Sequence, residues 1–593
     1  MSTLDLAVIG NCNYGALIDR RGRVVWCCLP QFDRDPTFCA LLGGDGAAGG
    51  MFEIELVDLV RAEQFYWRNS AVLETRLFDR AGGSIAIVDL APRFKQYGRA
   101  FRPIMLIRRV RPLAGSPRVR VRVRPRYDFG AGVPEVTRGS NHLRFVMPDR
   151  TFRLTTDAPV SCVLEEVPFV LAGPVEFVFG ADETIANALS DTAREFAERT
   201  DAYWRDWCRS LSLPFEWQDA VIRAAITLKL MSFEDTGAVI AALTTSIPEA
   251  ADSGRNWDYR YCWLRDAYFV VNALNRLSAT RTLEGYLDYI VNVVSTAADG
   301  YLRPVYGLLH ESDLAEREIA TLPGYRAMGP VRVGNGACAQ VQNDSYGSVI
   351  LACAQSYFDR RLDRPGDEAL FWRLEPLGEQ AVRRWDQPDA GIWEYRGRAA
   401  IHTHSAALCW AACDRLALIA GALGLDERKR QWRQRADQMR EAILARAWNE
   451  RRDSLAAVLD GDGVDASLLL LPGLGIVAAQ DPRFLATMAR IERELRRGPY
   501  LYRYADADDL GPPATAFIVC SFWYVDALAA CGRREEAREL FETLLARRNH
   551  VGLLGEDLDV ASGELWGNFP QTYSMVGLIQ AAMRLSRSWE GAF

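Results

Sequence analysis

The first third of the chain alternates hydrophobic and polar residues with a period of two. The alternation is clearest at 52–57, 73–78, 84–88 and 119–123, and Gly-rich turns such as 80–83 separate these segments. A period of two gives each strand one apolar face, and short polar turns join antiparallel strands. One apolar face needs a second layer to cover it. We therefore expect an antiparallel β-sandwich over residues 1–188.

Helical spacing replaces this alternation near residue 189. Phe196, Thr200 and Tyr203 follow one another at intervals of four and three residues, which is typical of one face of a helix. We interpret residues 189–213 as a helical linker between two domains.

The rest of the chain, residues 214–593, is predicted to be helical. The twelve expected helices span 217–233, 265–278, 281–298, 341–358, 368–386, 403–422, 426–446, 465–477, 482–496, 513–531, 533–547 and 570–587. Alternately long and short connections favour six helical hairpins closed into a ring, an (α/α)6 barrel. A solenoid of hairpins would be expected to carry a sequence repeat, and none is visible.

Polar and aromatic clusters precede every second helix of this set. They lie at 256–266, 334–336, 391–404, 460–465, 502–509 and 555–571. Because alternate helices of an up-and-down ring run in the same direction, the N-termini after these clusters share one rim. We expect the functional pocket there, where helix N-termini also offer free N–H groups.

Composition narrows the class of protein. A chain of 593 residues predicts two or three domains, and its formal net charge of −7 disfavours a nucleic-acid partner, which needs a basic face. There is no uncharged apolar run long enough to span a membrane, and residues 1–6 do not resemble a signal peptide. Thirteen scattered cysteines without a CxxC pair fit free thiols in a reducing compartment. We predict a cytoplasmic protein without a membrane partner.

Neither a cofactor nor a metal is expected. The chain has five histidines, of which His402 and His404 lie close together without other residues at ligand spacing. A small-molecule partner is expected, and a homo-oligomer stays an open alternative.

Two carboxylates of the predicted rim are candidates for catalysis. Glu394 lies between Trp393 and Tyr395, and an apolar aromatic setting favours the protonated form that a general acid needs. Glu556 lies in a loop rich in carboxylates, which favours an ionised, solvated base. An acid and a base across the scissile bond are what inverting glycoside hydrolysis requires. Each could instead be an ordinary surface carboxylate.

Arg265 and Asp266 begin a predicted helix inside a run of aromatic residues. Side by side they could bind adjacent sugar hydroxyls as donor and acceptor, or they could form a buried ion pair between helices. His404 could donate to a hydroxyl or help to cap its helix. Aromatic faces pack on the C–H faces of a pyranose. The remaining candidates for substrate binding are Trp257, Tyr261, Trp263, Trp393 and Arg396.

The stretch 256–266, Asn-Trp-Asp-Tyr-Arg-Tyr-Cys-Trp-Leu-Arg-Asp, closely resembles a motif of glycoside hydrolase family 15, the glucoamylases, bacterial-type trehalases and related exo-glucosidases. Five further stretches resemble that family in the same order: 10–12 with 26–33, 391–394, 403–405, 520–526, and 552–557 with 567–571. The likeness covers almost the whole chain. It implies an N-terminal β-sandwich, an (α/α)6 catalytic barrel and inversion at the anomeric carbon.

Residue by residue, the resemblance implies Glu394 as general acid and Glu556 as general base. It also implies that Arg265 and Asp266 hold the non-reducing glucose, with Trp263 and Trp393 as walls of the pocket.

The chain departs from the family's usual pattern at three places. These are Asp557 in place of Glu, the stretch 512–515 without the frequent Glu, and Met575 in place of His. We expect all three at the mouth of the pocket, where they would affect the leaving-group subsite. Residues 26–38 are our candidate for a loop of the sandwich that covers this mouth.

The expected function is that of an inverting, exo-acting α-glucoside hydrolase that releases β-glucose from small soluble α-glucosides. The predicted compartment favours trehalose over malto- or isomalto-oligosaccharides. Two alternatives stay open. A disaccharide phosphorylase would use phosphate in place of the activated water, and a non-catalytic carbohydrate-binding protein would use the barrel only to bind.

Overall fold

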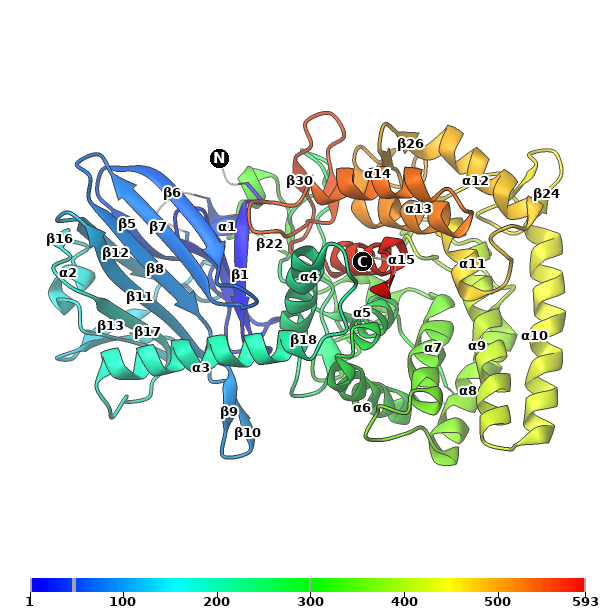
Figure 1. Cartoon of the computed structure of the whole chain (residues 1–593), viewed down its shortest axis with the longest axis horizontal. Coiled ribbons are helices and arrows are strands. Elements are labelled where there is room, and N and C mark those ends of the chain that lie inside the picture. Colours follow the sequence, from blue (N-terminus) through cyan, green and yellow to red (C-terminus); the bar gives the residue numbers. More distant parts are fainter. Residues whose placement is uncertain (1–2, 45–48, 298–299, 591–593) are drawn as a thin grey trace.

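A computed structural model describes residues 3–44, 49–297 and 300–590. An antiparallel β-sandwich lies at one end of the molecule and a barrel of helices at the other, with one long helix running beneath the sandwich toward the barrel (Figure 1). The predicted fold class, a β-sandwich followed by an (α/α)6 barrel, is confirmed.

The sandwich consists of two sheets whose paired strands are all antiparallel. In the described residues the first sheet has the order β1-β2-β3-β5-β12-β16, with β4 paired to β3. Its strands are β1 Leu6–Gly10, β2 Gly15–Asp19, β3 Val24–Cys28, β4 Pro36–Phe38, β5 Met51–Leu56, β12 Arg118–Arg124 and β16 Phe169–Val170.

The second sheet has the order β13-β14-β15-β17-β11-β8-β7-β6. Its strands are β6 Leu59–Tyr66, β7 Leu73–Asp79, β8 Ser84–Leu90, β11 Met105–Ala114, β13 Glu135–Arg138, β14 His142–Val146, β15 Thr151–Thr156 and β17 Val175–Ala181. A projecting hairpin, β9 Phe94–Gln96 and β10 Arg99–Phe101, and two short helices, α1 Ala40–Gly43 and α2 Val160–Leu164, complete this half.

Strand β12 shows why the alternating pattern predicts this architecture. Val119 and Val121 are buried between the layers. Arg120, between them, points to the other face and donates to Glu55, its cross-strand neighbour on β5, at 3.2 Å. Phenylalanines from both sheets fill the space between the layers, and the rings of Phe38 and Phe179 lie 5.2 Å apart. Period-two burial thus separates an aromatic core from a charged outer face.

The helices follow in chain order. They are α3 Leu189–Arg209, α4 Gln218–Leu230, α5 Leu264–Arg276, α6 Thr280–Thr296, α7 Asp344–Phe358, α8 Glu368–Arg384, α9 Thr403–Ala422, α10 Asp426–Ala447, η3 Ala466–Leu470, α11 Leu471–Leu474, α12 Pro482–Leu495, α13 Ile518–Ala530, α14 Arg534–Leu545 and α15 Thr572–Leu585.

Short strands and 3-10 turns lie in the connections of the barrel. They are β18 Ser232–Phe233, β19 Ala238–Val239, β20 Cys262–Trp263, β21 Val305–Tyr306, β22 Arg317–Ile319, η1 Tyr325–Ala327, β23 Val331–Val333, η2 Gly336–Ala339, β24 Trp448–Asn449, β25 Ser454–Leu455, β26 Arg496–Arg497, β27 Tyr500–Leu501, β28 Ala516–Phe517, β29 Asp557–Leu558 and β30 Leu565–Trp566.

An inner ring of the barrel is formed by α5, α7, α9, η3 with α11, α13 and α15, and α15 closes the ring against α5. The helices α4, α6, α8, α10, α12 and α14 pack outside it. Each predicted helix has a counterpart, but the eighth differs most from its predicted form. It is a 3-10 turn followed by four α-helical residues, because Gly475, with φ +94°, ends the helix.

Among the described residues, helix α9 is long and apolar enough to cross a membrane by length and composition alone, with 20 residues and a mean hydropathy of 1.3 over an 18-residue stretch. In the structure, 72% of that stretch is buried. Its apolar character therefore has a direct explanation in its central place in the barrel wall.

A buried group of charges joins the two domains. Arg93, which follows β8 of the sandwich, donates to both carboxylate oxygens of Glu234 at 2.6 and 2.7 Å. Lys229 at the end of α4 donates to the same carboxylate at 2.8 Å. Burial alone would raise the pKa of Glu234, but Lys229 and Arg93 outweigh it and hold that pKa well below its ordinary value. The Glu234 carboxylate is thus the shared counter-charge of the buried cations Arg93 and Lys229.

We predict that Glu234→Gln lowers the free energy of unfolding by about 2–4 kcal/mol, because two buried cations lose their counter-charge. The stabilisation is present above the unfolded pKa near 4.5 and is lost as pH falls through the folded pKa. The difference between the two proteins should therefore shrink below pH 4.5. Thermal and urea unfolding at several pH values measure it. Glu198→Gln, an exposed change on α3, is the control, and equal stability of all three proteins at pH 7 would contradict the prediction.

Candidate active site

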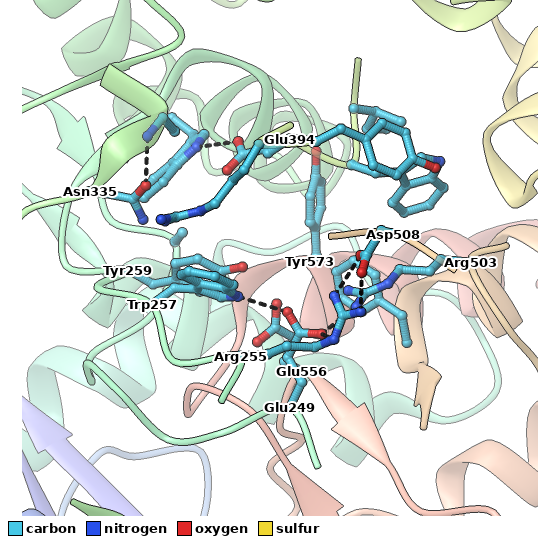
Figure 2. Close-up of a pocket in the computed structure, with 18 of the residues that line it drawn as sticks. Glu249, Arg255, Trp257, Tyr259, Asn335, Glu394, Arg503, Asp508, Glu556 and Tyr573 are labelled. Atoms are coloured by element: carbon cyan, nitrogen blue, oxygen red, sulfur yellow. Dashed lines mark hydrogen bonds and ion pairs between the residues drawn. The ribbon is translucent and has the colours of Figure 1, made fainter. Parts of the chain in front are cut away.

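A pocket opens at the rim where the inner helices begin (Figure 2). Residues from five connections line it, within 241–266, 335–340, 392–396, 503–517 and 556–573. Five of the six predicted clusters therefore converge. The sixth, 460–465, supports the wall from behind, since Asp465 accepts a hydrogen bond from the indole N–H of Trp393 at 2.8 Å.

Glu394 presents its carboxylate to this pocket with one oxygen anchored. Its Oε1 accepts hydrogen bonds from the Trp263 indole at 2.6 Å, from Arg265 at 3.1 Å and from Gln342 at 3.1 Å. Its Oε2 accepts none from any described residue. The side chain keeps 22% of its surface exposed, so this second oxygen is open to a ligand.

The backbone at Glu394 is in the left-handed region, with φ +57°. A side chain with a Cβ rarely adopts this conformation, which costs on the order of 1 kcal/mol or more and persists only where surrounding contacts fix it. The N–H of Glu394 donates to Gly391 and that of Tyr395 to Ala390, which closes the turn before α9. The turn aims the carboxylate into the pocket.

The predicted apolar setting of Glu394 is wrong in its details. The ring of Trp393 lies against those of Tyr504, Phe517 and Trp523. Tyr395 stacks on His402, with ring centroids 5.7 Å apart. The left-handed turn sends the neighbouring side chains into the wall. The carboxylate therefore meets an indole N–H, a guanidinium and an amide rather than hydrocarbon.

Arg265 lies at the centre of the acid's support. It is 4% exposed and donates to Asp344 and Gln342 at 2.8 Å and to the Tyr573 hydroxyl at 3.2 Å, in addition to Glu394. These contacts form the buried ion pair between helices that was the alternative to sugar binding for this residue. Arg265 and Asp266 both line the pocket.

Asp266 is a buried carboxyl group at the pocket surface. Burial and the charge of Glu394 raise its pKa to about 7, against the opposing effect of Arg265. The group can therefore offer either an acceptor or a donor to a ligand near neutral pH.

Glu556 faces the pocket from the side opposite Glu394, as Figure 2 shows. The predicted solvated setting is wrong, since Glu556 is 2% exposed. Backbone pairing explains the burial: Glu556 donates to Trp566, and Ile518 donates to Glu556. Burial, Asp557 and Glu249 raise the pKa of Glu556 well above its ordinary value, while the Tyr259 hydroxyl and Arg503 act against this rise.

Asp557 and Met575, two of the three departures from the family's pattern, do not lie at the mouth, as expected, but in the buried surroundings of Glu556. In the third, 512–515, Thr515 is buried as well, while Pro512 and Ala514 are exposed between Leu510 and Phe517, which line the pocket. Asp557 is 1% exposed and accepts a hydrogen bond from Thr515 at 3.0 Å. Burial and Glu249 raise its pKa to about 7. Ser574 and Met575 are fully buried, and the Ser574 hydroxyl donates to the carbonyl of Gly555 at 2.8 Å.

Glu249 is a third carboxylate of the pocket, and the sequence analysis missed it. It is 4% exposed, accepts from the Trp257 indole at 2.9 Å and is paired with Arg503. No motif marks Glu249, and its cation is 254 residues away in the sequence. Its one signal is its place shortly before the aromatic run 256–266. Tyr259, inside that run, was not among our candidates either.

The remaining candidates for substrate binding differ in whether they line the pocket. Trp257, Trp263, Trp393 and Arg396 line the pocket. Tyr261 is buried beside Trp263 and does not line it.

His404 also lies outside the pocket lining. It is 2% exposed behind Arg265, and burial lowers its pKa to about 4. It is therefore a neutral imidazole of the barrel core.

The prediction that residues 26–38 cover the mouth is wrong, since none of them lines the pocket. Trp26 is fully buried and donates to the carbonyl of Leu243 at 2.9 Å. The carbonyl of Arg34 accepts from Arg260 at 2.8 Å. The segment packs behind the pocket wall because its apolar side chains belong to the core between the domains.

No group of three or more His, Cys, Asp or Glu side chains in the described ranges is arranged to hold a metal ion. The polar groups of the pocket include the facing carboxylates of Glu394 and Glu556, further carboxylates such as Glu249 and Asp266, and arginine, amide and indole donors. Such a set can bind a neutral polyhydroxylated ligand and move protons.

Two family models match the chain. The model described as glycosyl hydrolases family 15 matches residues 217–583, and the model described as trehalase-like, N-terminal, matches residues 4–159. The first covers the barrel and the pocket, and the second covers most of the sandwich.

Full-length relatives agree with these matches. The chain is 30% identical over 601 residues to a trehalase of Thermoplasma volcanium, covering 98% of this chain and 93% of that protein. It is 32% identical over 630 residues to a trehalase of Mycolicibacterium smegmatis, covering 99% and 92%. A bacterial glucoamylase solved in complex with acarbose superposes with a TM-score of 0.71 at 14% identity, over 98% of this chain and 94% of the other. This last likeness shows the shared fold.

Proposed function

The chain belongs to glycosyl hydrolases family 15, and we propose that it hydrolyses α,α-trehalose with inversion, using Glu394 as general acid and Glu556 as general base. As a member of this family it is an exo-acting α-glucoside hydrolase with a carbohydrate substrate. The facing carboxylates of Glu394 and Glu556 are the single observation that carries the assignment of roles.

The contacts of Glu394 suit a proton donor. Three N–H donors fix Oε1, so the proton of the neutral acid is carried by Oε2, which faces the ligand space. In the proposed step this proton passes to the glycosidic oxygen as the bond from that oxygen to C1 of the glucose breaks. Arg265 acts through Glu394, because it orients the carboxylate and stabilises the anion left after proton transfer.

Glu556 suits the opposite role. A water between this carboxylate and C1 would lose one proton to Glu556 while its oxygen bonds to C1, which inverts the configuration there. The Tyr259 hydroxyl and the backbone N–H of Asn568, the latter at 3.4 Å, both bind the carboxylate and fix its position. We assign the binding of a glucose hydroxyl to Asp266, with Trp263 and Trp393 as walls.

The choice of trehalose rests on the relatives, since two proteins that share 30–32% of their residues with this chain over nearly its whole length are trehalases. The products separate the alternatives. Free glucose identifies a hydrolase, glucose phosphate formed with added phosphate identifies a phosphorylase, and binding without turnover identifies a carbohydrate-binding protein.

We also propose a cytoplasmic location. All thirteen cysteines lie in the described residues, and each is a free thiol. Disulfides are rare where thiols are kept reduced, as in the cytoplasm.

We predict that the purified enzyme releases two glucose molecules per trehalose and that Glu394→Gln reduces kcat by at least about 10²-fold. The amide keeps an oxygen that accepts from Trp263 and Arg265, so the melting temperature should change little. Steady-state kinetics and thermal unfolding measure both effects. Glu441→Gln, an exposed change on α10, is the matched control. A near-normal kcat in Glu394→Gln would rule out this acid.

The pH dependence tests the base. Glu556 must be ionised to act, so kcat/KM should rise with pH through its elevated pKa. Asp557→Asn removes the neighbouring charge that most disfavours this ionisation, and the acid limb of the profile should move to lower pH. Kinetics on trehalose between about pH 4 and 9 give the profile. Asp559→Asn, two residues on, should leave it in place. A limb that stays or moves upward in Asp557→Asn would contradict the assignment.

A further inference from the structure

Four chain segments beside the pocket are linked into a closed ring. We call this ring the collar and define it as residues 255–257, 508–509 and 396–397 with Glu316 and Arg332. The segments precede α5, α13 and α9, while Glu316 and Arg332 belong to the long excursion that carries β22 and β23.

The links can be followed around the ring. Arg255 donates to both oxygens of Asp508 at 2.7 and 2.5 Å. The neighbouring Asp509 accepts from the backbone N–H of Gly397 at 2.6 Å. Arg396 then donates to both oxygens of Glu316 at 2.9 and 2.6 Å.

Arg332 closes the ring. It lies 3.5 Å from the Glu316 carboxylate and donates to the carbonyl of Asn256 at 3.1 Å, next to Arg255. The guanidiniums of Arg396 and Arg332 lie 4.1 and 5.2 Å from the ring centroid of Trp257. Cation–π contacts of this kind hold the indole in place.

Burial differs along the ring. The side chains of Arg255 and Asp508 are 7% and 9% exposed, so this link is part of the folded core. Arg396 and Glu316 are 39% and 17% exposed, and Asp509 lies at the surface. Besides the contact of Arg396 with Trp257, the segment 396–397 is held by two carboxylate links, from Glu316 and Asp509. Both links can be removed without leaving a deeply buried charge.

We propose that the collar encloses the leaving-group subsite and admits one sugar unit beyond the scissile bond. Arg255, Trp257, Arg396, Asp508 and Asp509 line the pocket, so charged donors and acceptors surround the hydroxyls of one hexose. A groove open on one side would let a longer chain leave sideways, and the closed ring removes that path. Arg396, packed on the Trp257 ring at 4.1 Å, narrows the way straight out. The inference rests on the proposed function and makes it specific for disaccharides.

The test opens the ring with the double variant Glu316→Ala, Asp509→Ala. The substrates form two pairs that differ by one glucose on the leaving side: trehalose with trehalose carrying one extra α-1,4-linked glucose, and maltose with maltotriose. The readout is the ratio of kcat/KM for the longer sugar to kcat/KM for the shorter one. This ratio cancels any general loss of activity.

We expect the ratio in the wild-type enzyme to lie below about one tenth, the effect of a steric penalty of about 1.4 kcal/mol. The double variant should raise the ratio at least about fivefold, since exposed links of this kind are each worth up to about 1 kcal/mol. Asp206→Ala on α3 removes a carboxylate from an exposed ion pair far from the pocket and should leave the ratio unchanged.

Equal hydrolysis of the longer and shorter sugars by the wild-type enzyme would contradict the proposal that the collar admits one sugar unit beyond the scissile bond. An unchanged ratio in the double variant would contradict it as well. Preference for maltose over trehalose would overturn the proposed substrate alone. In that case the ratio of kcat/KM for maltotriose to kcat/KM for maltose still tests the collar.

Discussion

The ion pair between Arg265 and Glu394 is the contact on which the organisation of the pocket depends. Arg265 lies in the first turn of α5, and its partners come from three other places in the barrel: Asp344 from the first turn of α7, Tyr573 from α15, and Glu394 from the turn before α9. One buried guanidinium thus joins inner helices that are far apart in the sequence. The carboxylate of Glu394 is held by the same contacts that hold the ring of helices.

The two sides of the pocket differ in electrostatics. Around Glu394, the Arg265 guanidinium and the N–H donors of Trp263 and Gln342 balance the charge of the carboxylate. Around Glu556, carboxylates gather in a buried space, where Glu249 and Asp557 face Arg503 as their main cation. Burial and like charge favour protonated forms there, whereas Arg503 and the Tyr259 hydroxyl favour the carboxylate. Glu556 therefore acts as a base only where it is ionised, and the ionised fraction grows as pH rises through its elevated pKa.

The sequence predicted the fold well because burial follows period two in strands such as β12 and helical spacing in helices such as α3 and α12. It also placed Glu394, Glu556, Arg265 and Asp266 at one pocket, since helices of the same direction share a rim. It failed where contacts cross the chain without a local pattern. Glu249 and Arg503 are 254 residues apart, and Arg255 and Asp508 are 253 apart. The segment 26–38 and Met575 were misplaced because apolar residues near a site join the core rather than the mouth.

The central claim is that two facing carboxylates hydrolyse trehalose with inversion, and the anomers of the first products test it most directly. Early proton NMR spectra of the reaction should show β-glucose and α-glucose in equal amounts, because the attacked glucose inverts while the leaving glucose keeps its α configuration. A retaining mechanism would give α-glucose alone before mutarotation. Such a spectrum would contradict the account.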